Sequence, residues 1–382
     1  MLILNGFSKE RSRYCRKTSF LRIYGWILSP SIDRIVLLNG NNELLEVEVN
    51  IVREDIWQAY NKIGSPICAW KYEGKLEKDL DIDDVYLEFY KDKKLLFKQK
   101  IELFYNPEKE ELLDSLIYKD LDDIKSDMKK IYKEFENNFE NIKIYNFNEE
   151  SYLEWFNNVN YTQYPNYCKE FEEGEILHSK AMQHYLSIEL LKIKKSDVYL
   201  DIASSNSVCP DIINEFYSKN VYKQDIQYKE GIHGNKIGSN AESMPLDNNS
   251  IDKMALHCSF EHFENNSDIN FLNEAYRVLS SNGKVVITPF YMSESKHILT
   301  SPSIWENKYM MQDLPKFTRG YPIVINEEIK QRQEKIYSVK AFLEEIVEPF
   351  KDKFFIEVYH IANVNCIDLG LYPKFTLVCT KI

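Results

Sequence analysis

The sequence predicts an α/β domain over its second half, preceded by an antiparallel β-sandwich and a long helical connector. Three observations support this. Short segments in the first hundred residues alternate apolar and polar positions, a glycine-free stretch follows with helical periodicity, and strands alternate with helices after about residue 150. The expected domains are residues 1–105, 106–148 and 149–382, and two or three domains are typical for 382 residues.

The front domain is predicted to be an antiparallel sandwich because its strands have one apolar face, as in Leu45, Val47 and Val49. This region, with Gly25-Trp26 at one strand and the run from Arg53 to Trp57 after another, resembles β-sandwich modules at the front of bacterial glycan-modifying transferases. The expected strands cover residues 21–28, 34–38, 44–51, 69–72, 85–90 and 95–103.

The connector is predicted to be one helix over residues 107–141, roughly 50 Å long at about 1.5 Å per residue. It contains no glycine and no internal proline. The helix packs either on its own chain or, as a coiled coil, on a second copy, which makes a homodimer through residues 117–135 an alternative. Its heptad positions are Ile117, Leu121, Ile124, Met128, Ile131 and Phe135.

The second half is predicted to form a mostly parallel sheet with helices on both faces and an antiparallel edge made by two consecutive terminal strands. Ligands in such sheets bind beyond the carboxyl ends of the strands, at the switch point. The expected strands cover residues 198–203, 221–226, 253–258, 284–288, 354–362 and 375–380, and the helices lie at 179–192, from 210, and at 268–279 and 338–350.

Composition excludes several classes of function. The 48 Lys and Arg residues against 60 Asp and Glu residues leave a net charge of −12, which argues against a nucleic-acid partner. No apolar run approaches the ~20 residues of a membrane span, and the N-terminus lacks the pattern of a secretion signal, so a cytoplasmic protein is expected. The seven cysteines are scattered without a Cys-x-x-Cys pair, which is typical of reduced thiols.

The first strand of the α/β region leads directly into a turn of small residues, 204–207, and then into a helix. Such a turn exposes backbone N–H groups to a ligand at the positive end of the helix dipole. Asp225 follows Asp201 by 24 residues, at the predicted end of the neighbouring strand. This is the position from which an acid binds ribose hydroxyls in nucleoside-binding folds, although Asp is also common turn chemistry at strand ends.

Four further motifs follow in order. They lie at residues 238–245, ending in proline, at 257–263, at Arg277-Val278-Leu279 and at Asn282-Gly283. Together with Leu200-Asp201-Ile202, their order resembles class I S-adenosylmethionine-dependent methyltransferases over about residues 150–382. It is also similar to a methyltransferase subgroup found beside glycan biosynthesis enzymes. The resemblance implies O- or N-methyl transfer with S-adenosylmethionine as the cofactor.

The resemblance also implies where the cofactor binds. Asp201 and the loop after it face the methionine part, Asp225 accepts hydrogen bonds from the ribose, and Asn240 lies at the adenine edge. The implied cofactor-binding residues are Asp201, Ala203, Ser204, Ser205, Asp225, Ile226, Asn240, Ala241, Glu242, His257 and Cys258.

The sequence departs from the family pattern in the loop over residues 203–207, which contains no glycine. Glycine serves where φ is positive or a ligand approaches the backbone closely, so this loop is expected to keep negative φ or to hold the cofactor less closely. Asn240 replaces an aspartate, but its amide oxygen still accepts hydrogen bonds. The alternative is a non-catalytic glycan-binding or assembly protein with a degenerate methyltransferase domain.

Methyl transfer depends first on placing the acceptor in line with the methyl group, and then on a base that removes a proton. His257 is the first candidate base, followed by His233, Glu261 and His262. Glu261 and His262 also suit a purely structural role at the start of a helix. The spacing of these residues matches no zinc motif, so no metal site is expected.

The stretch over residues 291–337 is predicted to form a lid over the carboxyl end of the sheet. Aromatic side chains there suit stacking on a sugar, and Arg319 suits a phosphate or carboxylate; packing for stability is the alternative. The predicted acceptor is a hydroxyl or amino group on a glycan or a glycan-linked amino acid of bacterial surface polysaccharide or flagellar glycan biosynthesis. The predicted substrate-binding residues are Tyr291, Trp305, Arg319 and Tyr321.

Overall fold

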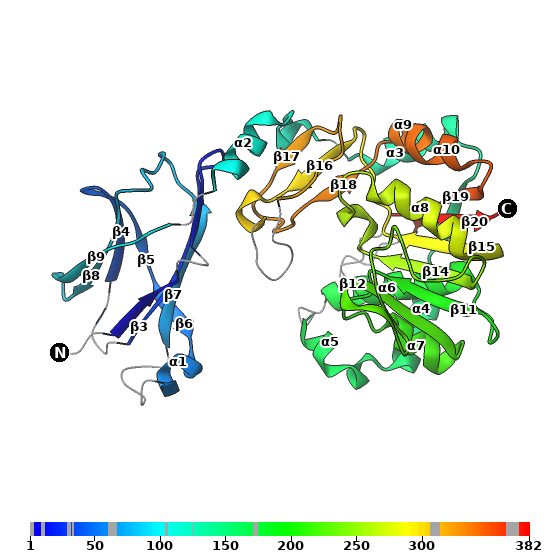
Figure 1. Cartoon of the computed structure of the whole chain (residues 1–382), viewed down its shortest axis with the longest axis horizontal. Helices are drawn as coiled ribbons and strands as arrows, with labels where there is room; N and C mark the ends of the chain where they lie inside the picture. The colour runs from blue at the N-terminus through cyan, green and yellow to red at the C-terminus, as the bar shows by residue number, and fades with distance from the viewer. Residues whose placement is uncertain are drawn as a thin grey trace. The chain divides into compact units, whose positions relative to one another are not determined.

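The computed structural model describes residues 4–8, 12–28, 32, 34–59, 67–103, 106–124, 126–170, 175–305, 314–363 and 374–382. The chain divides into two compact units (Figure 1). The first unit comprises Met1–Tyr118 together with Thr300–Pro315 and Ile325–Arg332, and the second comprises the remainder. Within the described ranges, no helix has both the length and the apolar character that a bilayer crossing requires.

The first unit contains two antiparallel sheets, as the sequence predicts. They enclose an apolar core, because alternate residues point inward: on β3, for example, Leu21 and Ile23 are buried, whereas Tyr24 is half-buried. One sheet has the order β1 (Leu4–Phe7), β3 (Phe20–Leu28), β7 (Ile67–Lys75), β6 (Val49–Val52), with β2 (Arg13–Cys15) beside β3, and the other has the order β5 (Asn42–Val47), β4 (Arg34–Asn39), β8 (Val85–Lys91), β9 (Lys94–Lys100).

Gly25 on β3 explains how Trp70 fits into this core. A Cβ at position 25 would lie 2.1 Å from the Trp70 ring, so only glycine leaves room for the indole. Trp70 is 1% exposed and packs with the inward residues of both sheets. A short helix, α1 (Glu54–Ala59), follows β6.

The prediction of one continuous helix over residues 107–141 is wrong. Leu116 and Ile124 both adopt extended backbone, and Asn106 and Asp127 each cap a separate helix by accepting backbone hydrogen bonds. Asn and Asp side chains compete with the helix for such hydrogen bonds, so they start new segments. The segment consists of α2 (Pro107–Ser115), a 3-10 turn η2 (Leu121–Asp123), α3 (Met128–Asn138) and β10 (Ile142–Asn146).

The heptad positions also separate in space. Ile131 and Phe135 are fully buried in the core of the second unit, whereas Ile117 and Leu121 are 66% and 51% exposed. Phe135 packs on the rings of Phe139, Phe342 and Phe375. Ile131 and Phe135 are therefore not available to the seam of a coiled coil.

The second unit is built on one mixed sheet of eight strands, which confirms the predicted Rossmann-like fold; the two terminal strands pair antiparallel as predicted, but β10 lies outside them at the edge. β11 is parallel to β12 and β14, and β20 is antiparallel to β15 and β19. The strand order is β10, β19 (Phe354–Ala362), β20 (Phe375–Lys381), β15 (Leu279–Thr288), β14 (Ile251–His257), β11 (Val198–Ile202), β12 (Asn220–His233), β13 (Lys236–Gly238).

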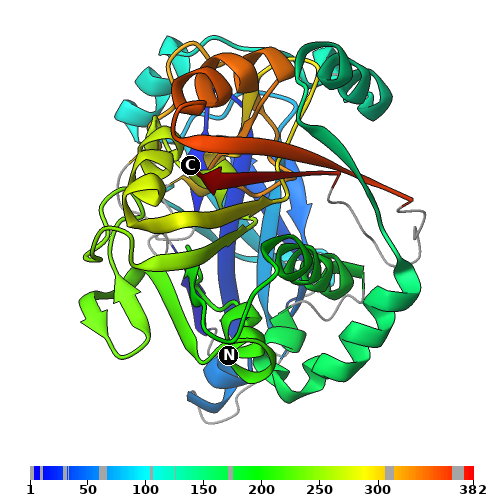
Figure 2. The same cartoon turned by 90° about the vertical axis from the view of Figure 1, so that its right-hand side faces the viewer.

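Helices cover both faces of this sheet (Figure 2). β11 shows why, because its buried residues alternate between two apolar clusters: Leu200 and Ile202 pack in the cluster that includes α8, and Tyr199 packs in the one that includes α6 and α7. The helices of the unit after β10 are α4 (Glu149–Val159), α5 (Pro165–Glu170), α6 (Glu175–Leu191), α7 (Cys209–Phe216), α8 (Ser267–Val278), α9 (Val339–Phe342) and α10 (Glu348–Phe350), with a π-helical turn (Leu343–Val347) between the last two.

The stretch between β15 and α9 contains a small sheet, in the order β17 (Ile323–Ile325), β16 (His297–Thr300), β18 (Glu334–Ile336). A 3-10 turn, η5 (Pro302–Ile304), follows β16. That this stretch acts as a substrate lid stays a prediction.

Candidate functional site

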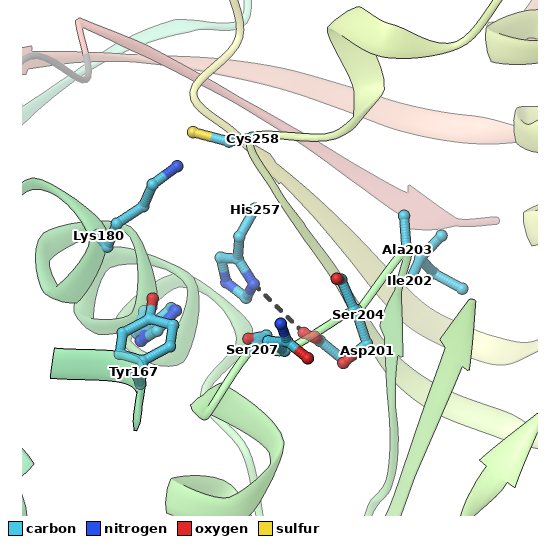
Figure 3. Close-up of a pocket in the computed structure, with 12 residues that line it drawn as sticks. Tyr167, Lys180, Asp201, Ile202, Ala203, Ser204, Ser207, His257 and Cys258 are labelled. Atoms are coloured by element: carbon cyan, nitrogen blue, oxygen red, sulfur yellow. Dashed lines mark ion pairs between the residues drawn. The ribbon is translucent and has the colours of Figure 1, made fainter. Parts of the chain in front are cut away.

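A pocket of about 160 Å³ lies at the carboxyl ends of β11 and β14. β11 stands between β12 and β14, where the strand order reverses, so the pocket occupies the switch point of the sheet. Figure 3 shows Asp201 and Ser204 on one side of His257, and Lys180 and Cys258 on the other. Its walls are Tyr167, Lys180, His184, Asp201, Ile202, Ala203, Ser204, Ser205, Asn206, Ser207, His257 and Cys258.

The loop after β11 adopts positive φ without any glycine. Ala203 has φ 51° and Ser205 has φ 41°, so the expectation of negative φ is wrong. Hydrogen bonds from the loop to β12 hold this shape: the Ala203 N–H donates to the Gln224 side chain at 3.2 Å, and the Ser205 N–H donates to Asp225 Oδ2 at 2.8 Å. They offset a cost of about 1–2 kcal/mol for each left-handed residue.

Asp225 is 5% exposed and anchors this loop rather than lining the pocket. Its Oδ1 accepts from the Gln227 N–H at 2.8 Å, and its Oδ2 from Ser205. Each carboxylate oxygen keeps a lone pair, so the ribose-binding role stays a prediction. The neighbouring Ile226 is 59% exposed, and the Tyr228 hydroxyl donates to the Ser205 carbonyl at 2.6 Å.

Asp201 and His257 form a buried pair at the base of the pocket. His257 Nδ1 lies 3.2 Å from Asp201 Oδ1, and the Tyr199 hydroxyl donates to the same oxygen at 2.7 Å. The other ring nitrogen, His257 Nε2, lies 2.9 Å from Ser187 Oγ. Both nitrogens of His257 therefore face protein groups, whereas a general base needs a nitrogen directed at the acceptor.

Three groups of metal-ligand type also meet here, because atoms of His184, Cys209 and His257 lie within 4.8 Å of one another. An ion on His257 Nε2 would sit at ~2.0–2.1 Å, in the direction that Ser187 Oγ now takes. Burial lowers the pKa of His184 and raises the pKa of the Cys209 thiol, so both groups are neutral. Ser187 Oγ contacts His257 Nε2 and donates to the His184 carbonyl oxygen at 2.9 Å, while the His184 ring contacts the Tyr161 hydroxyl through Nδ1 at 2.9 Å.

Three polar atoms of the pocket residues are buried without a hydrogen-bond partner among the described residues: Asp201 Oδ2, Ser204 Oγ and His257 Nδ1. Buried polar atoms are nearly always hydrogen-bonded in folded proteins, so a carboxylate oxygen left alone indicates a ligand with N–H donors. An amino-acid ammonium group is such a donor. The residues present thus fit the methionine end of the cofactor that the sequence implies.

The residues predicted for the adenine end lie beyond the pocket walls. Asn240 is exposed, and its side-chain oxygen accepts from the Glu242 N–H at 3.1 Å. Glu242 is tied to α8 by Ser267 and Asn270, and Ala241 is buried. The role of these residues in cofactor binding stays a prediction.

The remaining candidate bases occupy two places. His233 is exposed at the end of β12, with Nε2 2.9 Å from the Glu230 carbonyl oxygen, and does not line the pocket. Glu261 and His262 lie on a 3-10 turn, η4 (Phe260–His262), and His262 Nε2 is 3.7 Å from Glu261 Oε1. Glu261 is 4% exposed, and burial raises the pKa of its carboxyl group.

The predicted substrate residues do not line the pocket. Trp305 is buried in the first unit and donates from Nε1 to Thr300 Oγ1 at 2.6 Å. Tyr321 is buried and donates to Glu345 Oε2 at 2.8 Å. Arg319 is exposed and Tyr291 half-buried, and a substrate role for all four stays a prediction.

The sequence analysis did not predict the polar residues that α6 contributes to the site, Lys180, His184 and Ser187. They are spaced four and three positions apart and share one helix face, and α6 is buried on nearly every side. Polar residues on such a helix need partners, which is the signal that was available. Tyr199 lies two residues before Asp201 on β11, and nothing in the sequence marks it as a site residue in the same way.

Comparison with known proteins decides the class of this site. Residues 200–287, from β11 to the end of β15, match a family model described as a methyltransferase domain. The chain contains a methyltransferase domain. The protein is accordingly a methyltransferase enzyme, and its cofactor is S-adenosylmethionine.

Solved methyltransferases are similar to about half of the chain. An S-adenosylmethionine-dependent methyltransferase from Aquifex aeolicus is 14% identical, with a TM-score of 0.34, and the match covers 57% of this chain and 98% of that one. An S-adenosylmethionine-dependent methyltransferase from Mesorhizobium loti is 13% identical, with a TM-score of 0.35, and the match covers 52% of this chain and 98% of that one. A chain of the complex between the Haloferax volcanii Trm112 methyltransferase activator and its methyltransferase is 11% identical, with a TM-score of 0.33, and the match covers 55% of this chain and 97% of that one. No curated protein matches the chain.

Proposed function

We propose that this methyltransferase methylates a hydroxyl or amino group of a glycan-related or glycan-linked amino-acid acceptor in bacterial surface polysaccharide or flagellar glycan biosynthesis. The motif order of residues 200–263 and the resemblance of the front sheets to glycan-enzyme modules support the acceptor class. When bound, the cofactor supplies a methyl group on a positively charged sulfur. The observation that carries the proposed site is the buried, unpartnered Asp201 Oδ2 in a pocket at the switch point.

Asp201 binds the methionine ammonium group in this proposal. Tyr199 and His257 both contact Oδ1, at 2.7 Å and 3.2 Å, which fixes the carboxylate and leaves Oδ2 for the ligand. Ser187 in turn fixes the ring of His257. Nδ1 of His257 makes no hydrogen bond among the described residues but lies toward Asp201, and Nε2 lies toward Ser187, so neither nitrogen is directed at the acceptor. In this proposal His257 acts as a positioning residue, and the proton of the acceptor goes to another group.

The acceptor enters from the side of Lys180 and Cys258, opposite Asp201 and Ser204 (Figure 3). The residues on this side would place the nucleophilic atom of the acceptor in line with the methyl group, about 3 Å away. Cys258 is held by its contact to the Gln183 side chain at 3.2 Å. Glu261, three residues further along the chain, is the candidate base in this proposal.

Calorimetric titration of the intact chain with S-adenosylhomocysteine tests this proposal. We expect micromolar binding to the wild type and a roughly tenfold or greater loss in Asp201→Asn, because the amide removes the charge that the ammonium pairs with. Glu215→Gln, an exposed change on α7, serves as the matched control and keeps wild-type affinity. Absence of heat from the wild type at millimolar ligand contradicts the proposal.

A further inference from the structure

Three buried polar atoms at the turn after β14 have no hydrogen-bond partner among the described residues. They are Ser259 Oγ, Glu261 Oε2 and Gln333 Oε1, on residues that are 7%, 4% and 1% exposed. None of the three is a pocket wall of the cofactor site. Each atom can accept a hydrogen bond, although the Ser259 hydroxyl can also donate one, and buried polar atoms without partners are uncommon in folded proteins.

Gln333, the residue before β18, contacts the turn that carries Ser259 and Glu261. His262 Nδ1 lies 2.6 Å from the Gln333 carbonyl oxygen, and Gln333 Nε2 donates to the Phe263 carbonyl at 2.8 Å. The amide of Gln333 is thereby anchored on the η4 turn through its nitrogen, which leaves its oxygen as an acceptor beside that turn. Glu334, the next residue, places a second carboxyl group near Glu261.

The cluster contains two carboxyl groups, Glu261 and Glu334, with the positively charged types His262 and Lys180 near both. Burial raises the pKa of both Glu261 and Glu334, and the charges of His262 and Lys180 act in the opposite direction on both. Lys180 also lines the cofactor pocket, so the cluster lies within electrostatic range of that pocket. An ammonium group supplies three N–H donors and a positive charge, whereas a hydroxyl supplies one donor and no charge.

We propose that Ser259, Glu261, Gln333 and Glu334 bind the amino group of the acceptor, so that this methyltransferase acts on nitrogen. This rests on the proposed function, which places the acceptor on the Lys180 and Cys258 side of the pocket. The Glu261 carboxylate takes a proton from the bound ammonium: an N–H bond breaks, an O–H bond forms, and the nitrogen keeps the electron pair that it needs as a nucleophile.

The test uses glucosamine and glucose as probes, because they differ in a single amino group. Each sugar is titrated by calorimetry into the intact chain saturated with S-adenosylhomocysteine. We expect glucosamine to bind at least about tenfold more tightly than glucose, and Glu261→Gln to remove most of that preference by neutralising the carboxylate. Glu140→Gln, an exposed change in the same unit, keeps the preference.

A second variant guards against a folding defect in Glu261→Gln. Ser259→Ala removes one acceptor with little change in volume, and we expect it to weaken glucosamine binding several-fold without affecting glucose. Equal binding of the two sugars by the wild type, or an unchanged preference in both variants, overturns the inference. The S-adenosylhomocysteine titration distinguishes failure of the proposed function from failure of this inference. If S-adenosylhomocysteine does not bind, the proposed function is wrong. If it binds but the protein does not prefer glucosamine to glucose, only the inference of an amine acceptor is wrong.

Discussion

Ala203 and Ser205 show how a glycine-poor loop can still take the shape that a ligand site needs. The residue types alone favour negative φ, which is why the sequence led to the wrong expectation. The deciding contacts come from Gln224 and Asp225 on the neighbouring strand, and the local sequence around residue 203 does not reveal them. Tertiary hydrogen bonds here override the local preference of the backbone.

Replacing Ala203 by glycine tests this conclusion at the same scale. Glycine removes the strain of φ 51° but increases the entropy of the unfolded chain, so we expect Ala203→Gly to raise the free energy of unfolding by about 0.5–1 kcal/mol. Ala181→Gly in the buried helix α6 is the control, and it lowers that free energy by about 1 kcal/mol. Urea denaturation measures both; destabilisation by Ala203→Gly contradicts the account.

His257 illustrates the limit of residue-level prediction in the site. Its place at the end of β14 and its pairing with the motif around Asp201 follow from the sequence pattern. The contact with Ser187 does not, because it depends on how α6 packs against the sheet. That contact favours a positioning role for His257, and its role as a base stays a prediction.

At the scale of elements, strands and helices of the sheet were largely predictable. β11, β14 and α8 lie within a few residues of their expected ranges, because apolar runs bounded by turn residues mark buried strands clearly. The connector was not predictable in the same way. Its heptad spacing is present, but extended backbone at Leu116 and Ile124 and the cap at Asp127 divide the segment.

The packing of α3 makes a measurable prediction. Phe135 is fully buried among three other phenylalanine rings, so we expect Phe135→Ala to lower the free energy of unfolding by about 3–5 kcal/mol. Ile117→Ala, at an exposed position, changes it by less than about 0.5 kcal/mol. Light scattering on both variants reports the mass. A lower mass in Phe135→Ala with unchanged stability would indicate a dimer seam instead of a core position.

At the scale of the whole molecule, the chain does not divide at a single point. Thr300–Pro315 and Ile325–Arg332 belong to the first unit, although they lie between β15 and α9 in sequence. Composition and periodicity describe local segments, so they gave no indication that two later segments of the chain belong to the first unit. The three predicted domain ranges, 1–105, 106–148 and 149–382, stay a prediction.

Global stability should depend on pH through His184. Burial lowers the pKa of His184, so this side chain is neutral in the folded protein and takes up a proton on unfolding below about pH 6.5. Stability is therefore present above that value and falls as the pH drops. We expect His184→Gln to reduce the difference in unfolding free energy between about pH 7.5 and about pH 5.5, whereas exposed His233→Gln leaves it unchanged. Equal pH dependence in wild type and His184→Gln contradicts this assignment.

The most direct measurement of the central claim is a crystal structure of the intact chain with S-adenosylhomocysteine. We predict that the amino group of the ligand lies within hydrogen-bonding distance of Asp201 Oδ2, with Tyr199 and His257 still near Oδ1. A ligand bound away from the carboxyl ends of β11 and β14, or an amino group paired with a different carboxylate, would contradict it.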